Sequence, residues 1–364
     1  MTDFAPDEMR AREPAEAGAT LAERAGAPAV LPELPASAAA QVLHWRPPSM
    51  ADLDLLHTLM RVAGEVDHPR EVYSRELVER GLTGERFDLS ADAVIALSDG
   101  GEAVAYGEAK PADAETGVFL DGVVHPGWRG HGIGRALLSW QEARARQLLA
   151  ASGSDRPARI AVGAREENED ALSLFRATGF QPVRWWLELW RSLDEPIPEP
   201  GRALPEGVSL RAYSAELSEP TRLAMNDAFR GHWGSQPTTA QEWEEEHALE
   251  AFAPHLSRLA VTGAGTAEEP HVVVGAVLID VDEVDWELNG GPFAYLAMIG
   301  VVHAWRGKGL SSALLLSALR ACRDAGMLNA ALDVDAANPS GAVEMYSKLG
   351  FAERERSVTY AKHI

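Results

Sequence analysis

The chain has 364 residues, 46% hydrophobic and 24% charged, and at ~100–200 residues per domain this length predicts two globular domains. Its 33 Lys and Arg against 55 Asp and Glu give a formal net charge of −22. That is the wrong sign for a protein that neutralises nucleic-acid phosphates, so we expect no nucleic-acid partner. The acidity favours a cationic, amine-bearing small molecule, or it serves only solubility.

Cysteine usage and the start of the chain indicate the compartment. The single cysteine, Cys322, excludes an intramolecular disulfide, and no Cys/His cluster has metal-ligand spacing. The first residues lack the basic start and apolar core of a secretory signal, and no apolar run approaches the ~18 residues of a membrane span. We therefore expect a cytoplasmic protein with no bound metal and no membrane partner, and the sequence leaves its oligomeric state open.

Two segments of biased composition divide the chain. Residues 1–40 contain 13 Ala, 5 Pro and 5 Glu, which predicts a disordered tail with at most a helical Ala-rich part. Residues 194–206 contain four prolines that interrupt helical and strand periodicity, which predicts a linker. The remaining bodies, 41–193 and 207–364, each have the size of an ordinary domain.

The two bodies repeat the same motifs in the same order. The stretch VVHPGWRGHGIGRALL at 123–138 recurs as VVHAWRGKGLSSALLL at 301–316, with one gap in the alignment. The stretch NEDALSLFRATGF at 168–180 recurs as NPSGAVEMYSKLGF at 338–351. Two motifs repeated in order indicate a tandem duplication of one domain.

The same strand and helix pattern appears in each half. Apolar runs and alternating stretches predict six strands per half, with the repeated motifs at the starts of helices. The predicted strands are 43–47, 94–98, 102–109, 118–124, 158–164 and 183–190 in the first half, and 208–213, 257–263, 271–281, 293–302, 330–336 and 357–364 in the second. This pattern predicts a layered α/β fold.

A glycine-rich turn between a strand and a helix suits phosphate binding. Glycines let backbone N–H groups turn toward one point, and the helix start adds free N–H groups and a positive dipole end. The glycines are Gly130, Gly132 and Gly134 in the first half, and Gly307 and Gly309 in the second. Arg129, or Arg306 with Lys308, adds charge. The turn lies mid-domain without the acidic residue of a dinucleotide site, and no GK[ST] is present, which argues against Rossmann and Walker A sites.

With these motifs the sequence resembles the GNAT superfamily of acyl-CoA-dependent N-acyltransferases. The resemblance covers nearly all of 41–364, through the loop R/Q-x-x-G-x-G/A and the later element N-x-x-A-x-x-L-Y-x-x-x-G-F. The first-half loop matches fully. In the second half Arg306 and Gly309 match, and Ser311 stands at the last small position. A tandem pair of such domains is also similar to two-lobed acetyltransferases of the mycothiol synthase type.

The resemblance implies that each domain is a mixed, mainly antiparallel twisted sheet flanked by helices, and that acetyl-CoA is the acyl donor. It implies that backbone groups of the strand before the loop pair with the pantetheine, that loop amides hold the pyrophosphate, and that an asparagine lies near the cofactor arm. These residues are Val123, Val124, Arg129, Gly130, His131, Gly132, Ile133, Gly134 and Asn168 in the first half, and Val301, Val302, Arg306, Gly307, Lys308, Gly309, Leu310, Ser311 and Asn338 in the second.

One position distinguishes the two halves. The family commonly has a Tyr placed to protonate the departing thiolate, and this position holds Tyr346 in the second half and Phe175 in the first. A phenol can donate a proton and a phenyl ring cannot. We therefore expect catalysis by Tyr346 in 207–364, and a structural, cofactor-holding or regulatory role for 41–193. The alternative is that Tyr346 only stacks on the cofactor.

The sequence alone does not identify the general base or the residues of the acceptor pocket. Relatives often carry a Glu at the outer end of the fourth strand, where this sequence has Tyr295 and, in the first half, Val118. The carboxylates that remain as candidates for the general base are Asp282, Asp285, Glu287, Glu244, Glu245 and Glu246. The alternative to a carboxylate is a chain of water molecules. His232 and Trp233 follow the first helix of the second half and are candidates for the acceptor pocket, or Trp233 is only a buried anchor.

The sequence thus predicts an acetyl-CoA-dependent N-acetyltransferase that acts on a primary amine of a small molecule by direct transfer in a ternary complex. Thiol precursors of the mycothiol type, amino-sugar antibiotics and polyamines are all compatible acceptors. The alternatives are a longer acyl chain, a protein lysine as acceptor, or a non-catalytic acyl-CoA sensor. Cys322 continues an apolar helical stripe and is expected to be a packing residue, not an acyl-carrying nucleophile.

Overall fold

The computed structural model describes residues 19–38, 41–84, 86–111, 116–232, 235, 237–266 and 268–364. The first half contains strands β2 (Gln41–Arg46), β3 (Ala93–Ser98), β4 (Ala103–Pro111), β5 (Gly117–Val124) and β6 (Arg159–Arg165), and helices α2 (Leu53–Asp67), α3 (Arg75–Gly81), α4 (Leu89–Asp92), α5 (Ile133–Ala151) and α6 (Glu169–Ala177). The second half contains strands β8 (Ser209–Ala212), β9 (Arg258–Thr262), β10 (Val272–Asp280), β11 (Phe293–Val301) and β12 (Asn329–Asp335), and helices α7 (Ser218–Ala228), α8 (Ala240–His247), α9 (Leu310–Asp324) and α10 (Ala342–Lys348).

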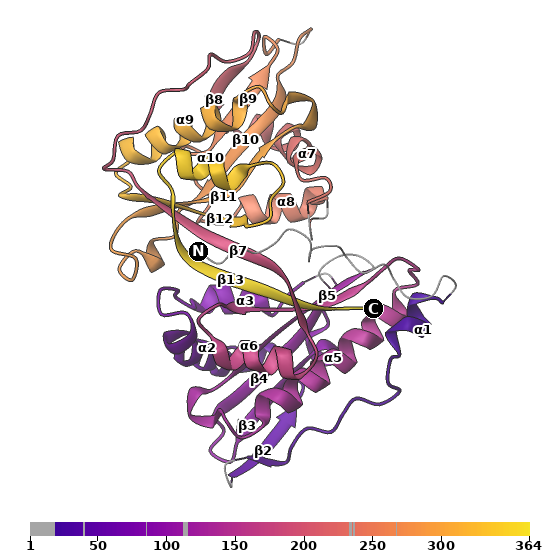
Figure 1. Cartoon of the computed structure of the whole chain (residues 1–364). Coiled ribbons are helices and arrows are strands. Elements are labelled where there is room, and N and C mark those ends of the chain that lie inside the picture. The colour runs from indigo at the N-terminus through magenta and orange to yellow at the C-terminus, as the bar shows by residue number, and fades with distance from the viewer. Residues whose placement is uncertain are drawn as a thin grey trace.

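Two long strands, β7 (Gln181–Ser192) and β13 (Ala352–His363), join these halves into one sheet (Figure 1). With the short N-terminal strand β1 (Ser37–Ala38), the described strands follow the order β1-β2-β3-β4-β5-β6-β13-β7-β12-β11-β10-β9-β8. Neighbours are antiparallel except β5 with β6 and β11 with β12, which are parallel. The predicted α/β class, with a mixed and mainly antiparallel sheet flanked by helices, is confirmed, and the two halves share one continuous sheet.

The last strand of each half pairs with the sheet of the other half. Strand β7 follows α6 in the first half but is antiparallel to β12 over residues 186–192. Strand β13 ends the second half but is antiparallel to β6 over residues 357–363. The two exchanged strands also pair with each other. The strand predictions at 183–190 and 357–364 are confirmed, but periodicity within a strand carries no information about which sheet it joins.

The exchange completes both hydrophobic cores. Leu187 and Leu189 of β7 pack in the second-half core against α9 and α10. Val358 and Tyr360 of β13 pack in the first-half core, where Tyr360 contacts Phe175 with ring centroids 5.7 Å apart. Each core therefore depends on side chains that arrive from the other half of the chain.

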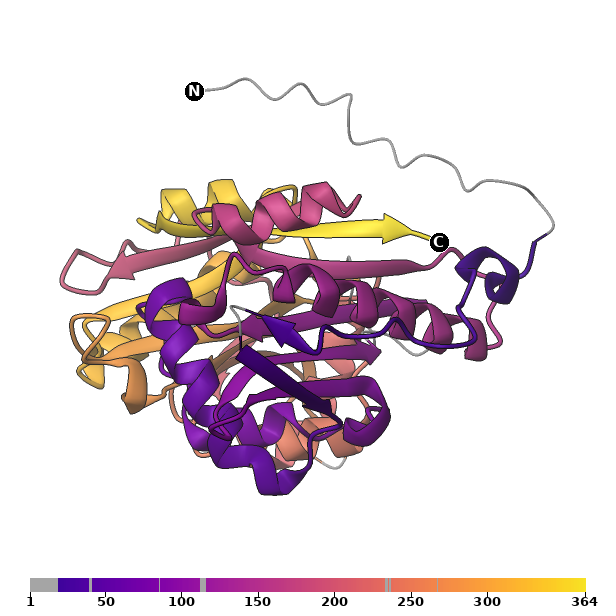
Figure 2. The same ribbon diagram turned by 90° about the horizontal axis from the view of Figure 1, so that it is seen from below.

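The N-terminal segment differs from the disordered tail that its composition predicts. Helix α1 (Leu21–Ala25) begins with a Thr20 capping box and buries Leu21 and Ala25 completely against α5. The Arg146 side chain donates to the Ala25 carbonyl at 2.7 Å. Both views place α1 beside α5 (Figure 2). The prediction is therefore wrong for residues 19–38, because two apolar side chains suffice to dock this short helix, and residues 1–18 lie outside the described residues.

In the part of the chain that the structure describes, no helix is both long and apolar enough to cross a bilayer.

Candidate active site

The two glycine-rich turns have the same geometry. Each follows a short 3-10 turn, η3 (Pro126–Trp128) or η6 (His303–Trp305), and leads into α5 or α9. Gly130 and Gly132 have φ of 78° and 84°, and Gly307 and Gly309 have φ of 74° and 81°. A residue with a Cβ is strained in this left-handed region, which is why the turn requires glycine at these four positions.

The structure aligns the two turns without the gap that the sequence comparison introduces. The His125 amide donates to the Val104 carbonyl at 2.8 Å, and the Val302 amide donates to the Val274 carbonyl at 3.0 Å. His125 therefore corresponds to Val302, so Val301 corresponds to Val124 rather than to Val123. His125 and His303 are not equivalent, and their repetition in the sequence is a coincidence of neighbouring positions.

The arginines of the turns lie beneath the loop rather than in front of it. Arg129 donates through Nε to the Val124 carbonyl at 3.1 Å, and its guanidinium forms two bonds of 2.8 and 2.6 Å with Asp67 at the end of α2. Arg306 donates through Nε to the Val301 carbonyl at 3.2 Å and through Nη2 to the Ala228 carbonyl at 2.5 Å. Both arginines therefore hold the turn in shape.

The charge of the two turns differs. Asp67 neutralises Arg129, whereas among the described residues no carboxylate forms an ion pair with Arg306. Lys308 lies over the Trp305 ring at 4.2 Å, and a Cβ at Gly309 would lie 3.7 Å from Cδ of Arg202. The second-half turn is thus the more positive of the two and suits a pyrophosphate better.

The parallel strands before each turn separate. Strand β11 pairs with β12 only from Phe293 to Tyr295, and β5 pairs with β6 only from Gly117 to Phe119. Beyond these points β11 remains bonded to β10 through Val301 on its other side. Residues 296–301 therefore present backbone groups toward a gap, where an extended amide-bearing chain can pair as an added strand.

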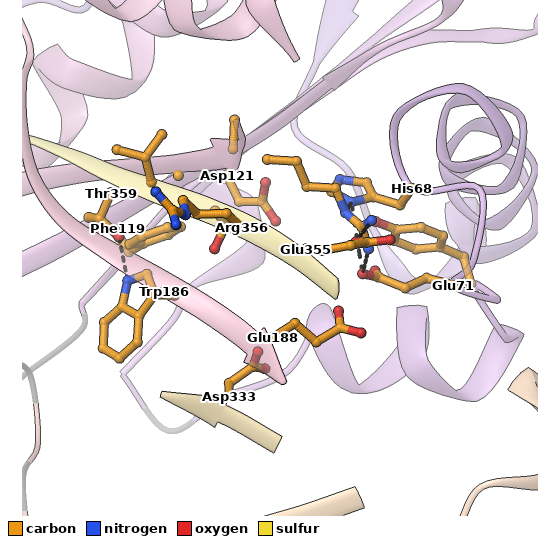
Figure 3. A pocket seen from close by; sticks show the side chains of 16 residues that line it. His68, Glu71, Phe119, Asp121, Trp186, Glu188, Asp333, Glu355, Arg356 and Thr359 are labelled. Carbon is orange, nitrogen blue, oxygen red and sulfur yellow. Dashed lines mark hydrogen bonds and ion pairs between the residues drawn. The ribbon is translucent and has the colours of Figure 1, made fainter. Parts of the chain in front are cut away.

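A cavity of about 550 Å³, shown in Figure 3, is lined by residues of both halves. It lies on the face of the sheet opposite α9 and α10, because Asp333 of its lining alternates along β12 with Leu332 and Val334, which pack in the core with those helices. The residues that line it come from the loop after α2, from β5, β6 and β12, and from the exchanged strands β7 and β13. They are His68, Glu71, Tyr73, Phe119, Asp121, Gly163, Ala164, Arg165, Trp186, Glu188, Asp333, Glu355, Arg356, Ser357, Val358 and Thr359. The cavity forms where β7 and β13 cross between the halves. The pattern of strands in the sequence does not reveal this crossing, so it does not predict the cavity either.

One wall of the cavity is acidic. Asp333 of β12 lies opposite Glu188 of β7 in the strand pairing, and its carboxylate accepts a 2.7 Å hydrogen bond from the Tyr295 hydroxyl. Burial raises the pKa of the Asp333 carboxyl and, more strongly, that of the Tyr295 phenol. Tyr295 therefore stays protonated and its hydroxyl donates a hydrogen bond to the Asp333 carboxylate. A cationic group fits beside this wall.

The opposite wall is tied together by Arg165. Its guanidinium bonds Glu71 at 2.6 Å and the His68 ring at 2.8 Å, and it forms an ion pair with Glu355. Glu355 also bonds Arg70 at 2.6 Å. These contacts connect the loop after α2 with β6 and β13, and they pair the positive charge of Arg165 with carboxylates of the protein.

Tyr346 lies on α10, on the other face of the sheet from the cavity. It is 6% exposed, packs edge to face on Phe351, and belongs to the second-half core. Burial raises the pKa of its phenol to about 12. Its counterpart Phe175 is likewise buried, against Phe180 and Tyr360. The second half therefore has a neutral phenol, Tyr346, at the position where the first half has the phenyl ring of Phe175.

The two asparagines of the second motif differ in role. Asn168 caps α6 by accepting from the Ala171 amide at 3.1 Å, whereas Asn338 accepts from the Ser340 amide at 3.0 Å, and α10 begins later, after Gly341. The Asn338 amide lies 3.4 Å from the His232 ring, and Trp233 lies outside the described residues.

None of the base candidates named from the sequence lines the cavity. The Asp285 carboxylate accepts from the Val72 amide at 2.8 Å, and Asp282 caps a 3-10 turn. Asp333 was not named as a candidate from the sequence. The feature that points to it there is an acidic residue at an outward-facing position of an otherwise apolar strand. Cys322 is a packing residue as expected, because it is fully buried and burial raises the pKa of its thiol to about 12.

Sequence comparison finds the same architecture in known proteins. The model of the acetyltransferase (GNAT) family matches residues 56–180 and 222–351, one copy in each half. The mycothiol acetyltransferase of Frankia alni is 32% identical over 331 residues, covering 87% of this chain and 94% of that protein. The mycothiol acetyltransferase of Thermobispora bispora is 29% identical, covering 85% and 96%.

Solved structures share the tandem arrangement. A GCN5-related N-acetyltransferase from Sphaerobacter thermophilus superposes with a TM-score of 0.66 at 27% identity, covering 88% of this chain and 95% of its own. A tandem GNAT protein from the clavulanic acid biosynthesis pathway superposes with a TM-score of 0.59 at 21% identity, covering 88% and 98%. At 88% of this chain, the likeness extends over both halves.

Proposed function

The chain belongs to the acetyltransferase (GNAT) family, and from that premise we propose that its second half transfers an acetyl group to a primary amine held in the cavity between the halves. The protein is an acetyl-CoA-dependent N-acetyltransferase of small-molecule amines. The single observation that carries the assignment to the second half is Tyr346, which occupies the position that Phe175 occupies in the first half.

Acetyl-CoA supplies the activated acyl group when it is bound. The residues proposed to hold it are Arg306, Gly307, Lys308, Gly309, Leu310 and Ser311 around its pyrophosphate, and Val301 and Val302 beside its pantetheine, with Asn338 near its arm. The turn lies at the start of α9, where unpaired N–H groups attract anions. The uncompensated charge of Arg306 supports this half over the first, where Asp67 neutralises Arg129.

We assign the general-acid role to Tyr346. Its raised pKa keeps the hydroxyl protonated at neutral pH, so it can give a proton to a thiolate as that group departs. Its position on the α10 face places it across the sheet from the cavity, so that the separated strands lie between acid and acceptor. The first half, with Phe175, is proposed to be structural or regulatory, and Val123, Val124 and the turn 129–134 remain its proposed cofactor contacts.

The acceptor is proposed to be a small cationic amine. The cavity of about 550 Å³ accommodates a molecule of drug or disaccharide size, and its acidic wall at Asp333 and Glu188 suits an ammonium group. The relatives named mycothiol acetyltransferase support an acceptor related to mycothiol, and amino sugars and polyamines also fit this description. We further propose a cytoplasmic enzyme without nucleic-acid or membrane partners, in line with its net charge of −22.

Turnover tests this function directly. Acetyl-CoA is incubated with the protein and a panel of amines containing cysteinyl amino sugars, aminoglycosides and polyamines, and the release of free thiol is followed. We expect release that depends on one class of amine, with an acetylated product confirmed by mass spectrometry. Binding of acetyl-CoA without release for any amine would instead indicate an acyl-CoA sensor.

A further inference from the structure

We propose that Asp333 is the catalytic base that takes a proton from the acceptor's ammonium group, and that Tyr295 is the positioning residue that holds the Asp333 carboxylate in place. The inference rests on the proposed function and names a residue of that same site. Its basis is one contact, the 2.7 Å hydrogen bond from the Tyr295 hydroxyl to Oδ2 of Asp333, at a particular place in the sheet.

That place is where strands β11 and β12 separate. Their last paired residues are Tyr295 and Ala331, and Asp333 is the next residue of β12 on the same face as Tyr295. The pair therefore bridges the mouth of the gap between the strands. Side chains of the intervening positions, such as Leu332 and Val334, point into the core with Tyr346. Asp333 and Tyr346 thus flank the gap from opposite faces of the sheet.

The carboxylate is open to the acceptor. Asp333 lines the cavity together with Glu188, and Figure 3 shows both side chains at the same end of it. Groups from four elements face Asp333: Tyr295 on β11, Glu188 on β7, Glu71 in the loop after α2, and Arg165 on β6. Burial is the main cause of its raised pKa, Tyr295 and Arg165 lower the pKa, and Glu188 and Glu71 raise it further. A base with a raised pKa accepts a proton from an ammonium group more readily.

The first half lacks both members of the pair. Strands β5 and β6 last pair at Phe119 and Ala161, so Phe119 corresponds to Tyr295 and Gly163 corresponds to Asp333. The match of Tyr295 with Val118 made from the sequence is therefore wrong by one residue, because β11 contains an irregularity in its pairing with β10. A Cβ at Gly163 would lie 3.3 Å from the Phe119 ring, so a carboxylate has little room there. Tyr346 and this pair therefore mark the second half independently of each other.

The step balances with the residues present. The Asp333 carboxylate takes one proton from R–NH₃⁺, which leaves a neutral amine with a free electron pair. The nitrogen forms the new C–N bond with the thioester carbonyl carbon as the C–S bond breaks. The second nitrogen proton is lost to solvent and Tyr346 gives a proton to the departing sulfur, which leaves as the thiol. Asp333 then releases its proton to water, and Tyr346 regains a proton from water.

The test compares Asp333→Asn, Tyr295→Phe and the control Asp324→Asn, in which an exposed carboxylate at the end of α9 is changed in the same way. With the amine that gives turnover, Asp333→Asn is expected to lower kcat by ~10²–10⁴-fold, as for a lost acid or base, with an unchanged thermal transition. Asp324→Asn is expected to leave kcat within twofold.

The pH profile separates a base from a structural carboxylate. In the wild type, kcat/KM is expected to rise with pH through the pKa of Asp333, above the ordinary Asp value of ~4. Tyr295→Phe removes a hydrogen bond that favours the charged carboxylate, so this rise is expected to move to higher pH. An Asp333→Asn enzyme that keeps more than half of wild-type kcat, or a Tyr295→Phe profile that does not move, overturns the proposal. A wild-type protein without turnover on any amine contradicts the proposed function itself, and this inference with it.

Discussion

At the scale of single residues, the site is set by which polar side chains are buried and which partners they have. Tyr346 is 6% exposed in the core around α9 and α10, and no hydrogen bond from its hydroxyl to another described residue is present. The Tyr346 hydroxyl oxygen is nevertheless not one of the buried polar atoms that lack a hydrogen-bond partner among the described residues. The ring is therefore packed in the core while the hydroxyl reaches solvent, where it can meet the reacting sulfur.

The first prediction concerns this hydroxyl. Tyr346→Phe is expected to lower kcat by ~10²–10⁴-fold while the affinity for acetyl-CoA stays within a few-fold, because the ring still packs on Phe351. Single-turnover kinetics and calorimetric binding measure the two effects. Phe175→Tyr, the matched change in the first half, is expected to do little. A Tyr346→Phe enzyme with more than half of the wild-type rate would leave only a stacking role.

Sequence reasoning reaches some of these residues and not others. Tyr346 and the glycines belong to motifs with fixed spacing, and the turns have the left-handed backbone that their glycines predict. Asp333 belongs to no motif, because its chemistry arises from the Tyr295 side chain of a neighbouring strand that is 38 residues away in sequence. Pairing between strands is a tertiary property, and alternation along one strand does not reveal it.

At the scale of elements, the exchanged strands decide the architecture. Strand β7 leaves α6 and crosses to β12, while β13 leaves α10 and crosses to β6. The helices and strands could be predicted because each has its own period, and the α/β class followed from their order. The exchange could not be predicted, because the alternation of apolar and polar residues in β7 and β13 would equally suit pairing with the sheet of their own half.

The second prediction follows from the exchange. A protease site placed in 194–206, which contains no helix or strand, is expected to give two fragments that stay together under native conditions. Separating them would expose Leu187 and Leu189 on one side and Val358 and Tyr360 on the other. Gel filtration at micromolar concentration before and after cleavage checks this, with urea as the control that dissociates them. Two separate peaks without denaturant would contradict the described pairing.

At the scale of the whole molecule, two halves of similar fold differ in charge and chemistry at the same positions. The turn of the first half has Arg129 neutralised by Asp67, whereas in the second half the partners of Arg306 among the described residues are carbonyl groups. Backbone geometry is nevertheless equal, with φ of 84° at Gly132 and 81° at Gly309. The chain therefore offers a matched pair of changes to locate the productive acetyl-CoA site.

The third prediction uses this pair. Gly309→Ala is expected to weaken acetyl-CoA binding to the productive site by roughly five- to thirtyfold, which corresponds to the ~1–2 kcal/mol cost of left-handed backbone in a residue with a Cβ. Gly132→Ala carries the same backbone cost and is expected to leave KM for acetyl-CoA within twofold. Titration of both variants and steady-state kinetics measure this. The reverse result would move catalysis to the first half.

The exchanged strands also give the molecule a pseudo-twofold axis. Counting from the matching Gly179 and Gly350, Trp186 of β7 and Ser357 of β13 are equivalent positions, and they lie directly opposite each other in the pairing. Both line the cavity, so the axis of the duplicated chain passes through the proposed acceptor site. Two identical subunits would place the same side chain twice at this point. Because both copies are joined in one chain, the protein has a Trp on one side of its pseudo-twofold axis and a Ser on the other. The site can therefore bind a single asymmetric acceptor, whereas a symmetric dimer would present two identical halves.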